Sequence, residues 1–116
     1  MRRGDIHVVD FEPARGSEPN KRRPAVIVSN DASNSIVARL GRGLVTVVPL
    51  TSNVSRLYTF QVLLPAARTG LARDSRAQAE QVRSVAVERV GDKVGLVPYS
   101  LLARLDEALR VHLDLG

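Results

Sequence analysis

Two short polar segments of the sequence carry the side chains best suited to chemistry. The first, Arg15 to Arg23, holds four cations around one carboxylate, Glu18. Because an arginine guanidinium matches phosphate oxygens with paired donors, this charge on an exposed loop favours phosphate binding. The second, Thr51-Ser52-Asn53, follows a strand-like run, where hydroxyl groups can point into a cleft. Each segment also has an ordinary interpretation, a solvated charged turn or a self-capping turn, and neither is decisive alone.

The histidines and aromatic residues give weaker signals. His7 lies in an alternating segment without a neighbouring Ser or Asp constellation, so a structural role is favoured over general-base catalysis. His112 falls on the apolar stripe of a terminal helix, and we expect it to pack there. Tyr58 and Phe60 stand two positions apart, so in a strand they share one face and form a base-stacking platform. Core packing explains these two rings equally well.

Composition excludes several classes of protein. The 116 residues, 44% hydrophobic and 25% charged, predict one globular domain spanning residues 1–116. The absence of cysteine removes disulfides, thiolate ligands and thiol nucleophiles, and two histidines without clustered carboxylates predict no metal site and no cofactor. No apolar run approaches the ~20 residues that cross a bilayer, and the N-terminus lacks a signal-peptide pattern. We therefore expect a cytoplasmic protein that does not enter a membrane.

The cationic side of the charge balance is almost entirely arginine. The formal net charge is +5, and Lys21 and Lys93 are the only lysines among 17 basic residues. Arginine is the side chain best matched to phosphate, so a polyanion is the first partner to consider. A basic surface that only improves solubility is the alternative.

The elements that must position these residues are mostly strands. Alternation and β-branched runs predict four of them, over residues 5–11, 25–29, 44–50 and 58–64. A long exposed loop is predicted over residues 12–24. Pro49 is expected to end its strand or mark a bulge, and Asp31 to cap a short helical turn.

The C-terminal half is expected to end in a helix. Leucines recur at helical spacing over residues 101–113, and Pro98 suits a helix start. Residues 73–87 give a mixed signal, helical by propensity over 76–81 and strand-like by alternation over 82–87. Several short strands with one terminal helix predict a mainly β fold with α, a small barrel or curled sheet with the helix against it.

Taken in order, blocks along the chain resemble the MazF/PemK family of endoribonuclease toxins. These blocks are Arg3-Gly4-Asp5-Ile6, Gly16-Ser17-Glu18, Arg23-Pro24-Ala25-Val26, Val48-Pro49-Leu50-Thr51-Ser52, Tyr58-Thr59-Phe60-Gln61-Val62-Leu63-Leu64, Asp74-Ser75, Glu80-Gln81-Val82-Arg83 and Leu105-Asp106-Glu107-Ala108-Leu109. They extend over nearly the whole chain at compatible spacings, which makes the resemblance specific. It implies an SH3-like small barrel with a C-terminal helix, and strand through about Val87.

The resemblance also implies an activity and partners. The family cleaves single-stranded RNA without metal in a basic groove of a homodimer, and a cognate antitoxin inhibits it. We expect that antitoxin to use an acidic segment that is disordered before binding. The 2′-hydroxyl of the RNA attacks the adjacent phosphorus and leaves a 2′,3′-cyclic phosphate and a 5′-hydroxyl end.

By position, the family's main catalytic pair corresponds to Arg23 and Thr51. Arg23 neutralises charge on the phosphoryl oxygens and Thr51 orients the phosphate. Glu18 is expected to assist in proton transfer or loop ordering, and which group moves the protons stays open. The predicted RNA-binding residues are Ser17, Lys21, Arg22, Ser52, Asn53, Tyr58, Phe60, Gln81 and Arg83.

The chain departs from the family pattern in two places. His7 stands where Trp or Tyr is common, and Arg76-Ala77-Gln78-Ala79 replaces large apolar residues. Two other functions stay open, a gyrase-poisoning toxin like those of the CcdB group and a plain nucleic-acid-binding module. The Gly-Ser-Glu, Arg-Pro and Pro-Leu-Thr-Ser blocks favour the ribonuclease, and a plain binding module gives Thr51 no role.

Overall fold

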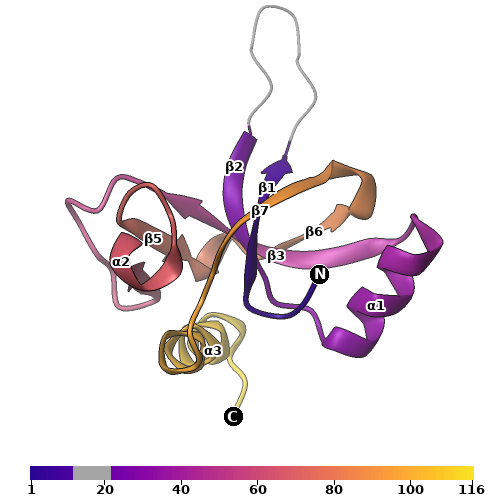
Figure 1. Cartoon of the computed structure of the whole chain (residues 1–116). Helices are drawn as coiled ribbons and strands as arrows, with labels where there is room; N and C mark the ends of the chain where they lie inside the picture. The colour runs from indigo at the N-terminus through magenta and orange to yellow at the C-terminus, as the bar shows by residue number, and fades with distance from the viewer. Residues whose placement is uncertain (12–21) are drawn as a thin grey trace, which may run out of the picture.

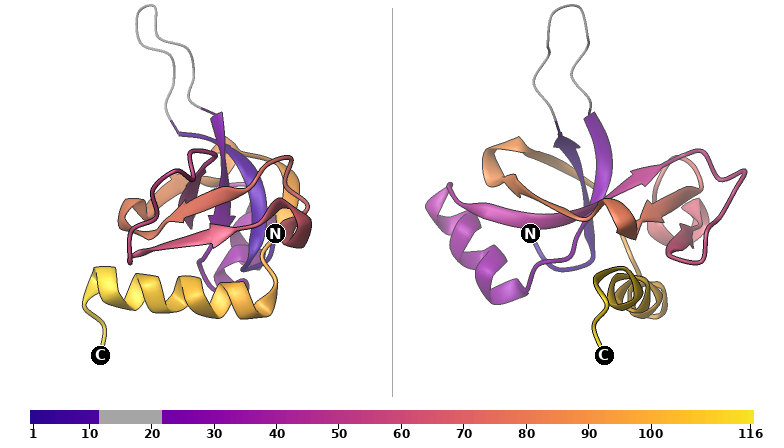
Figure 2. Two further views of the ribbon diagram at one scale, coloured as in Figure 1. Left: turned by 90° about the vertical axis from the view of Figure 1, so that its left-hand side faces the viewer. Right: turned by 180° about the vertical axis from the view of Figure 1, so that it is seen from behind.

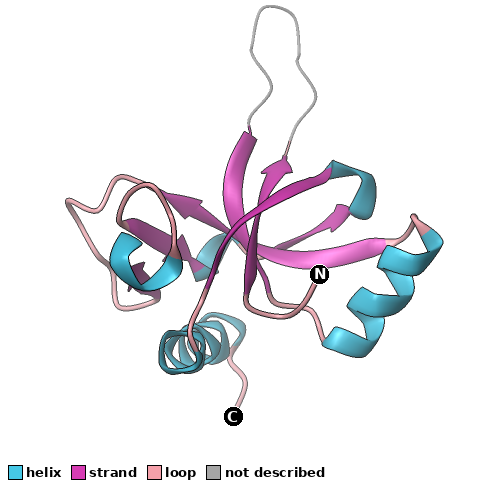
Figure 3. Ribbon diagram, viewed as in Figure 1, coloured by secondary structure: helices cyan, strands magenta, loops and turns pink. Residues whose placement is uncertain are grey.

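The computed structural model describes residues 1–11 and 22–116, which form a strongly curled, mainly antiparallel sheet with helices around it (Figures 1 and 3). The strands are β1 (Asp5–Asp10), β2 (Arg22–Ile27), β3 (Leu44–Thr51), β4 (Gln61–Leu64), β5 (Ser75–Gln78), β6 (Arg83–Ala86) and β7 (Val90–Leu96). The helices are α1 (Asp31–Leu40), α2 (Ala66–Thr69) and α3 (Tyr99–Leu113), with 3-10 turns η1 (Ala79–Gln81) and η2 (Val87–Arg89).

The long strand β3 organises the sheet. The strand order is β4-β5-β3-β2-β1-β7, and β6 pairs with the first half of β3 while β5 pairs with its last two residues. Among the described residues, the end strands β4 and β7 are not hydrogen-bonded to each other, so the sheet curls like a small barrel without closing. The predicted fold class, mainly β with a C-terminal helix, is confirmed.

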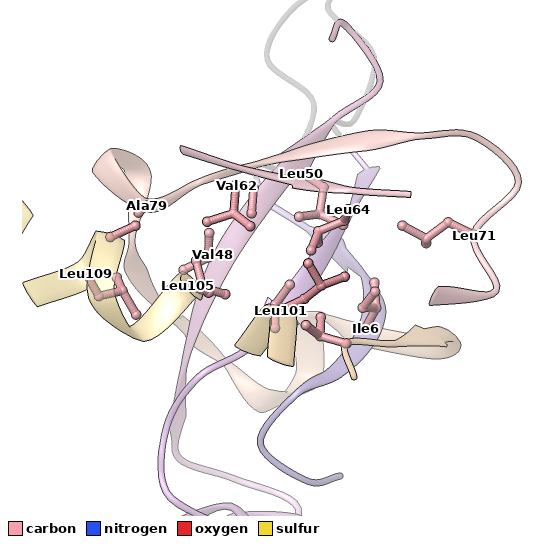
Figure 4. Packing of buried hydrophobic residues seen from close by; sticks show 14 residues of the cluster. Ile6, Val48, Leu50, Val62, Leu64, Leu71, Ala79, Leu101, Leu105 and Leu109 are labelled. Carbon is pink, nitrogen blue, oxygen red and sulfur yellow. The ribbon is translucent and has the colours of Figure 1, made fainter. Parts of the chain in front are cut away.

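Apolar side chains fill both faces of the sheet. Val45 and Val47 of β3 belong to one core cluster and Val48 and Leu50 to the other, because alternate residues of a strand point to opposite faces. Helix α3 lies along the cluster that contains Val48 and Leu50, where its apolar face packs against β4 and η1 (Figures 2 and 4). Leu105 of α3 is completely buried, which contributes about 1.5–3 kcal/mol. Among residues 1–11 and 22–116, no helix has the length and hydropathy to span a membrane.

Three strand predictions need correction. The strand predicted over 58–64 begins only at Gln61, because the Gln61 amide donates to the Tyr58 carbonyl at 3.0 Å and closes a turn. Pro49 neither ends β3 nor marks a bulge. It lies where the outer neighbour of β3 changes from β6 to β5, so its missing N–H disturbs no ladder there. The strand predicted through Val87 is interrupted by η1.

The structure also corrects the helix predictions. Asn30, and not Asp31, caps α1, since its side chain accepts a hydrogen bond from the Ser33 amide at 2.8 Å. The helix has ten residues instead of one short turn, and it ends at Gly41 in the left-handed conformation with φ of 69°. His112 of α3 is exposed, so the prediction that it packs in the core is wrong.

Two elements were not predicted, and one boundary moves. α2 is a single turn that the sequence did not indicate, and β7 contains two glycines that weaken the strand pattern. Strand β2 begins at Arg22, so residues 22–24 belong to the sheet and not to the predicted loop. The remainder of that loop prediction, over residues 12–21, lies outside the described residues.

Candidate active site

Arg23 and Thr51 lie at the same end of the neighbouring strands β2 and β3. The two strands are antiparallel, with Ala25 opposite Pro49 and Val26 opposite Val48. Arg23 and Thr51 each lie two residues beyond the last pair of this ladder, at the same end of it. The two strands therefore bring a guanidinium and a hydroxyl group to one end of the sheet.

Both side chains line one pocket of about 430 Å³. Its polar lining consists of three arginines and three hydroxyl-bearing residues, Arg22, Arg23, Arg73, Thr51, Ser52 and Ser75. Leu50 and Leu71 supply much of the apolar lining. Among the described residues, no carboxylate lines this pocket. The arrangement suits an anionic group attached to a partly apolar molecule, as a nucleotide is.

Arg23 is positioned by the pairing of its strand with β1. The ladder between β1 and β2 places Val9 opposite Arg23. Arg23 is half-buried, whereas the sequence had placed it at the exposed end of a loop. This correction strengthens its candidacy, because a side chain held by paired strands is better fixed for electrostatic work than one on a free loop.

Thr51 ends β3 and also shapes the turn that follows. Its Oγ1 accepts a hydrogen bond from the Asn53 amide at 3.3 Å, and the Asn53 side chain in turn accepts from the Ser55 hydroxyl at 2.7 Å. The self-capping turn considered for this segment is therefore present. A hydroxyl group that accepts one hydrogen bond still carries a proton to donate, so the capping role leaves Thr51 able to contact a phosphate oxygen.

The other predicted residues divide into three groups. Arg22 and Ser52 line the pocket together with Arg23 and Thr51, the predicted catalytic pair. Ser17, Glu18 and Lys21 lie outside the described residues. The remaining predicted residues stand away from the pocket lining, and they are Asn53, Tyr58, Phe60, Gln81 and Arg83. The guanidinium of Arg83 lies 5.4 Å from the centre of the Phe11 ring, so this side chain has a cation–π partner within the chain.

Tyr58 and Phe60 form a stack with each other. Their ring centres are 5.3 Å apart and their planes differ by 6°, although neither residue belongs to a strand. The guanidinium of Arg56 lies 5.3 Å from the centre of the Tyr58 ring, and Tyr58 is 41% exposed. The two rings therefore form an exposed cation–aromatic stack with Arg56, and not the shared strand face that the spacing had predicted.

Asp5 and His7 belong to a separate polar cluster. The buried carboxylate of Asp5 accepts a hydrogen bond from the Arg2 amide at 2.8 Å and lies 3.2 Å from the Lys93 ammonium. Burial alone would raise the pKa of Asp5, but the Arg2 hydrogen bond and the Lys93 contact together lower that pKa below its ordinary value. His7 donates from Nδ1 to the Gly91 carbonyl at 2.9 Å. Neither residue lines the arginine pocket, which agrees with a structural role for His7.

Arg73 is the pocket residue that the sequence did not single out. Arg73 lies 50 positions after Arg23 in the sequence, and it does not belong to a recognisable motif. The one available signal was its place directly before the Asp74-Ser75 block. Among residues 1–11 and 22–116, no group of three or more His, Asp or Glu side chains is arranged to hold a metal ion.

The fold and the pocket together define a small basic β protein with an arginine-rich site for an anion. Residues 2–113 match the family model described as PemK-like, MazF-like toxin of type II toxin-antitoxin system. The chain belongs to this family, as the ordered sequence blocks had indicated.

Individual relatives match along almost the full chain. The chain is 60% identical over 115 residues to endoribonuclease MazF9 of Mycobacterium tuberculosis, covering 99% of this chain and 98% of the relative. It is 30% identical over 115 residues to endoribonuclease EndoA of Bacillus subtilis, covering 99% and 96%. Among solved structures, a MazE-MazF structure from Deinococcus radiodurans matches with a TM-score of 0.80 and 28% identity, covering 100% of this chain and 97% of that one.

Proposed function

We propose that this protein is the endoribonuclease toxin of a type II toxin–antitoxin pair and that it cleaves single-stranded RNA in the arginine pocket. The observation that carries the site assignment is that Arg23 and Thr51 line the same pocket. The activity is supported by the family and by the 60% identity to an endoribonuclease. Charge supports the substrate class, because the net charge is +5 and three arginines line the pocket.

In the proposed reaction the RNA supplies its own nucleophile. The 2′-oxygen forms a bond to the adjacent phosphorus while the bond from phosphorus to the 5′-oxygen breaks. The 2′-hydroxyl gives up a proton and the departing 5′-oxygen gains one, so the products are a 2′,3′-cyclic phosphate and a 5′-hydroxyl end. Arg23 neutralises the charge that develops on the phosphoryl oxygens, and Thr51 donates a hydrogen bond that fixes the phosphate.

The other predicted residues complete the proposal. Glu18 assists in proton transfer or orders its loop. The phosphate backbone is held near the pocket by Ser17, Lys21, Arg22, Ser52 and Asn53, with Gln81 and Arg83 along the groove. The stack of Tyr58 and Phe60 receives an unpaired base, since an exposed aromatic face adds binding energy with any base. All of these residues belong to one domain, residues 1–116.

The partners follow from the same chemistry. An acidic segment of the cognate antitoxin occupies the arginine pocket and competes with RNA, because it satisfies the same charges. An antitoxin partner is supported by the MazE-MazF structure from Deinococcus radiodurans and by a structure of a mycobacterial endoribonuclease in complex with its cognate antitoxin. Two copies of the chain form a homodimer, supported by the exposed apolar side chains Val111, Leu113 and Leu115 at the end of α3. The toxin acts in the cytoplasm, where single-stranded RNA is present.

The test is a cleavage assay on a long single-stranded RNA and a DNA of the same sequence, both in excess EDTA. We expect RNA to be cut at recurring short sites with cyclic-phosphate and 5′-hydroxyl ends, and DNA to stay intact. Arg23→Ala should lower the cleavage rate about 100-fold or more, since removing one preorganised donor has that effect. Arg42→Ala is the matched control, because it removes an exposed arginine from the turn after α1.

Two results would contradict the proposal. Intact RNA with folded, antitoxin-free protein would favour a gyrase poison or a plain binding module. Cleavage that is lost in EDTA and restored by a divalent ion would refute the metal-free route.

A further inference from the structure

Arg73 stands on a loop that is fixed at both ends. On one side Leu71 is buried in the core, and its amide donates to Thr69 Oγ1 at 3.3 Å. On the other side Asp74 Oδ1 accepts from the Ala66 amide at 2.8 Å, and the Ser75 hydroxyl donates to the Arg73 carbonyl at 3.2 Å. The backbone at Arg73 is therefore held in place while its side chain is exposed.

This loop forms a different wall of the pocket from the one that carries the catalytic pair. Arg23 and Thr51 come from the paired strands β2 and β3, whereas Arg73 comes from the connection between α2 and β5. The two walls are joined because β5 pairs with the end of β3, with Thr51 opposite Arg76. Figure 1 shows α2 and β5 on the same side of the molecule as the end of β3. A strand of RNA seated in the pocket thus lies between Arg73 and the catalytic pair.

The charge of Arg73 is not neutralised by the described part of the chain. No carboxylate of residues 1–11 and 22–116 forms an ion pair with it, and none lines the pocket. Three guanidinium groups around one space repel each other, and an anionic ligand relieves this repulsion. By contrast, Arg68 on the neighbouring helix donates to the Ser100 hydroxyl at 2.9 Å and does not line the pocket.

We propose that Arg73 binds an RNA phosphate next to the scissile one and holds the strand against the catalytic pair. This inference rests on the proposed function and adds a residue to it. The scissile phosphate is assigned to Arg23 and Thr51, which line the pocket from neighbouring ends of β2 and β3. Arg73, on the other wall, meets the neighbouring phosphate of the same strand. Its contribution is made equally in the bound substrate and in the transition state, so it affects binding more than the chemical step.

The experiment measures binding and cleavage separately. The binding probe is a short RNA containing a mapped cleavage site with a 2′-deoxy nucleotide at the scissile position, which removes the nucleophile. Arg73→Ala should weaken binding about 10-fold. It should also reduce the slope of log affinity against log salt by about 0.7–1, the loss of one phosphate contact. The cleavage rate of Arg73→Ala at a saturating concentration of the same RNA without the 2′-deoxy substitution should stay within about 3-fold of the rate of the parent protein.

Two further variants make the test specific. Arg68→Ala removes the same charge from the neighbouring helix α2 and should leave the salt slope unchanged. Arg73→Lys keeps the charge and should keep the slope. A salt slope for Arg73→Ala equal to that of Arg68→Ala overturns the inference, and so does a rate loss at saturating RNA as large as that of Arg23→Ala. If the parent protein cuts no RNA, the proposed function fails; if it cuts RNA and Arg73→Ala binds normally, only this inference fails.

Discussion

Arg3 and Asp106 are joined by an ion pair that ties the N-terminal segment to α3. The guanidinium contacts the carboxylate through two nitrogens, at 2.5 Å and 3.3 Å, and its Nε donates to the Val28 carbonyl at 2.8 Å. Both side chains are about 30% exposed. Arg3 thus connects the segment before β1 with the end of β2 and with α3, the helix that covers the larger core cluster.

Removing this carboxylate should destabilise the fold without changing the chemistry. Asp106→Ala leaves the Arg3 guanidinium partly buried without its anion, so we expect a loss of about 1–2 kcal/mol in the free energy of unfolding. Urea unfolding followed by circular dichroism measures it. Glu107→Ala is the control, because that neighbouring carboxylate is well exposed and its pair with Arg110 lies on the surface. An equal effect of both variants would show that the ion pair between Arg3 and Asp106 does not stabilise the fold.

The hydroxyl of Thr51 should be required for cleavage, and its methyl group should not. Thr51→Val keeps the shape and removes the donor, so the rate should fall about 100-fold. Thr51→Ser keeps the donor and should stay within about 10-fold of the parent rate. Single-turnover cleavage of an RNA with one mapped site measures both variants. If Val and Ser reduce the rate equally, Thr51 acts through its methyl group as well, because Thr51→Ser keeps both the donor and the oxygen that caps the turn.

The sequence predicted those site residues that stand in recognisable local motifs, but it did not predict how the folded chain brings them together. Arg23 and Thr51 could be named because each stands in a recognisable local block, but their approach depends on the register of β2 against β3. Arg73 was missed because its place in the pocket is set by tertiary packing of the loop before β5. Pairing with β1 likewise makes a strand of β7, whose two glycines lower its intrinsic preference.

A methyl group at Gly95 should disturb the site from a distance. A Cβ atom there would lie 2.7 Å from the Thr69 carbonyl oxygen and 3.4 Å from Leu71, so β7 and the α2 connection must separate. Gly95→Ala should therefore cost about 1–3 kcal/mol of stability and weaken RNA binding by moving the loop that carries Arg73. Thermal unfolding and binding of the 2′-deoxy RNA are the two measurements. Asp92→Ala, an exposed change on the same strand, should alter neither; if Gly95→Ala also alters neither, the close contact does not constrain the loop.

The Asp5 cluster should make the protein less stable in acid. Because the pKa of Asp5 is lower in the folded protein than its ordinary value, the unfolded chain binds the proton more readily. The stabilisation from the ionised carboxylate is complete above the unfolded pKa of about 4, and it is lost as the pH falls through the folded pKa. Asp5→Asn should lower the free energy of unfolding by about 1–3 kcal/mol at pH 7, and the difference from the parent protein should shrink below about pH 4.

Urea unfolding at a series of pH values from 7 down to 3 checks this prediction, with Asp92→Asn on β7 as an exposed control. Lys93→Met should reproduce part of the effect, because the ammonium at 3.2 Å helps to keep the Asp5 carboxylate ionised. A difference in the free energy of unfolding between the parent protein and Asp5→Asn that stays constant down to pH 3 would mean that the aspartate stabilises the fold through shape and hydrogen bonding alone. A difference that decreases as the pH falls assigns the stabilisation to the charge of Asp5, because protonation then removes the same interaction that the amide of Asn lacks.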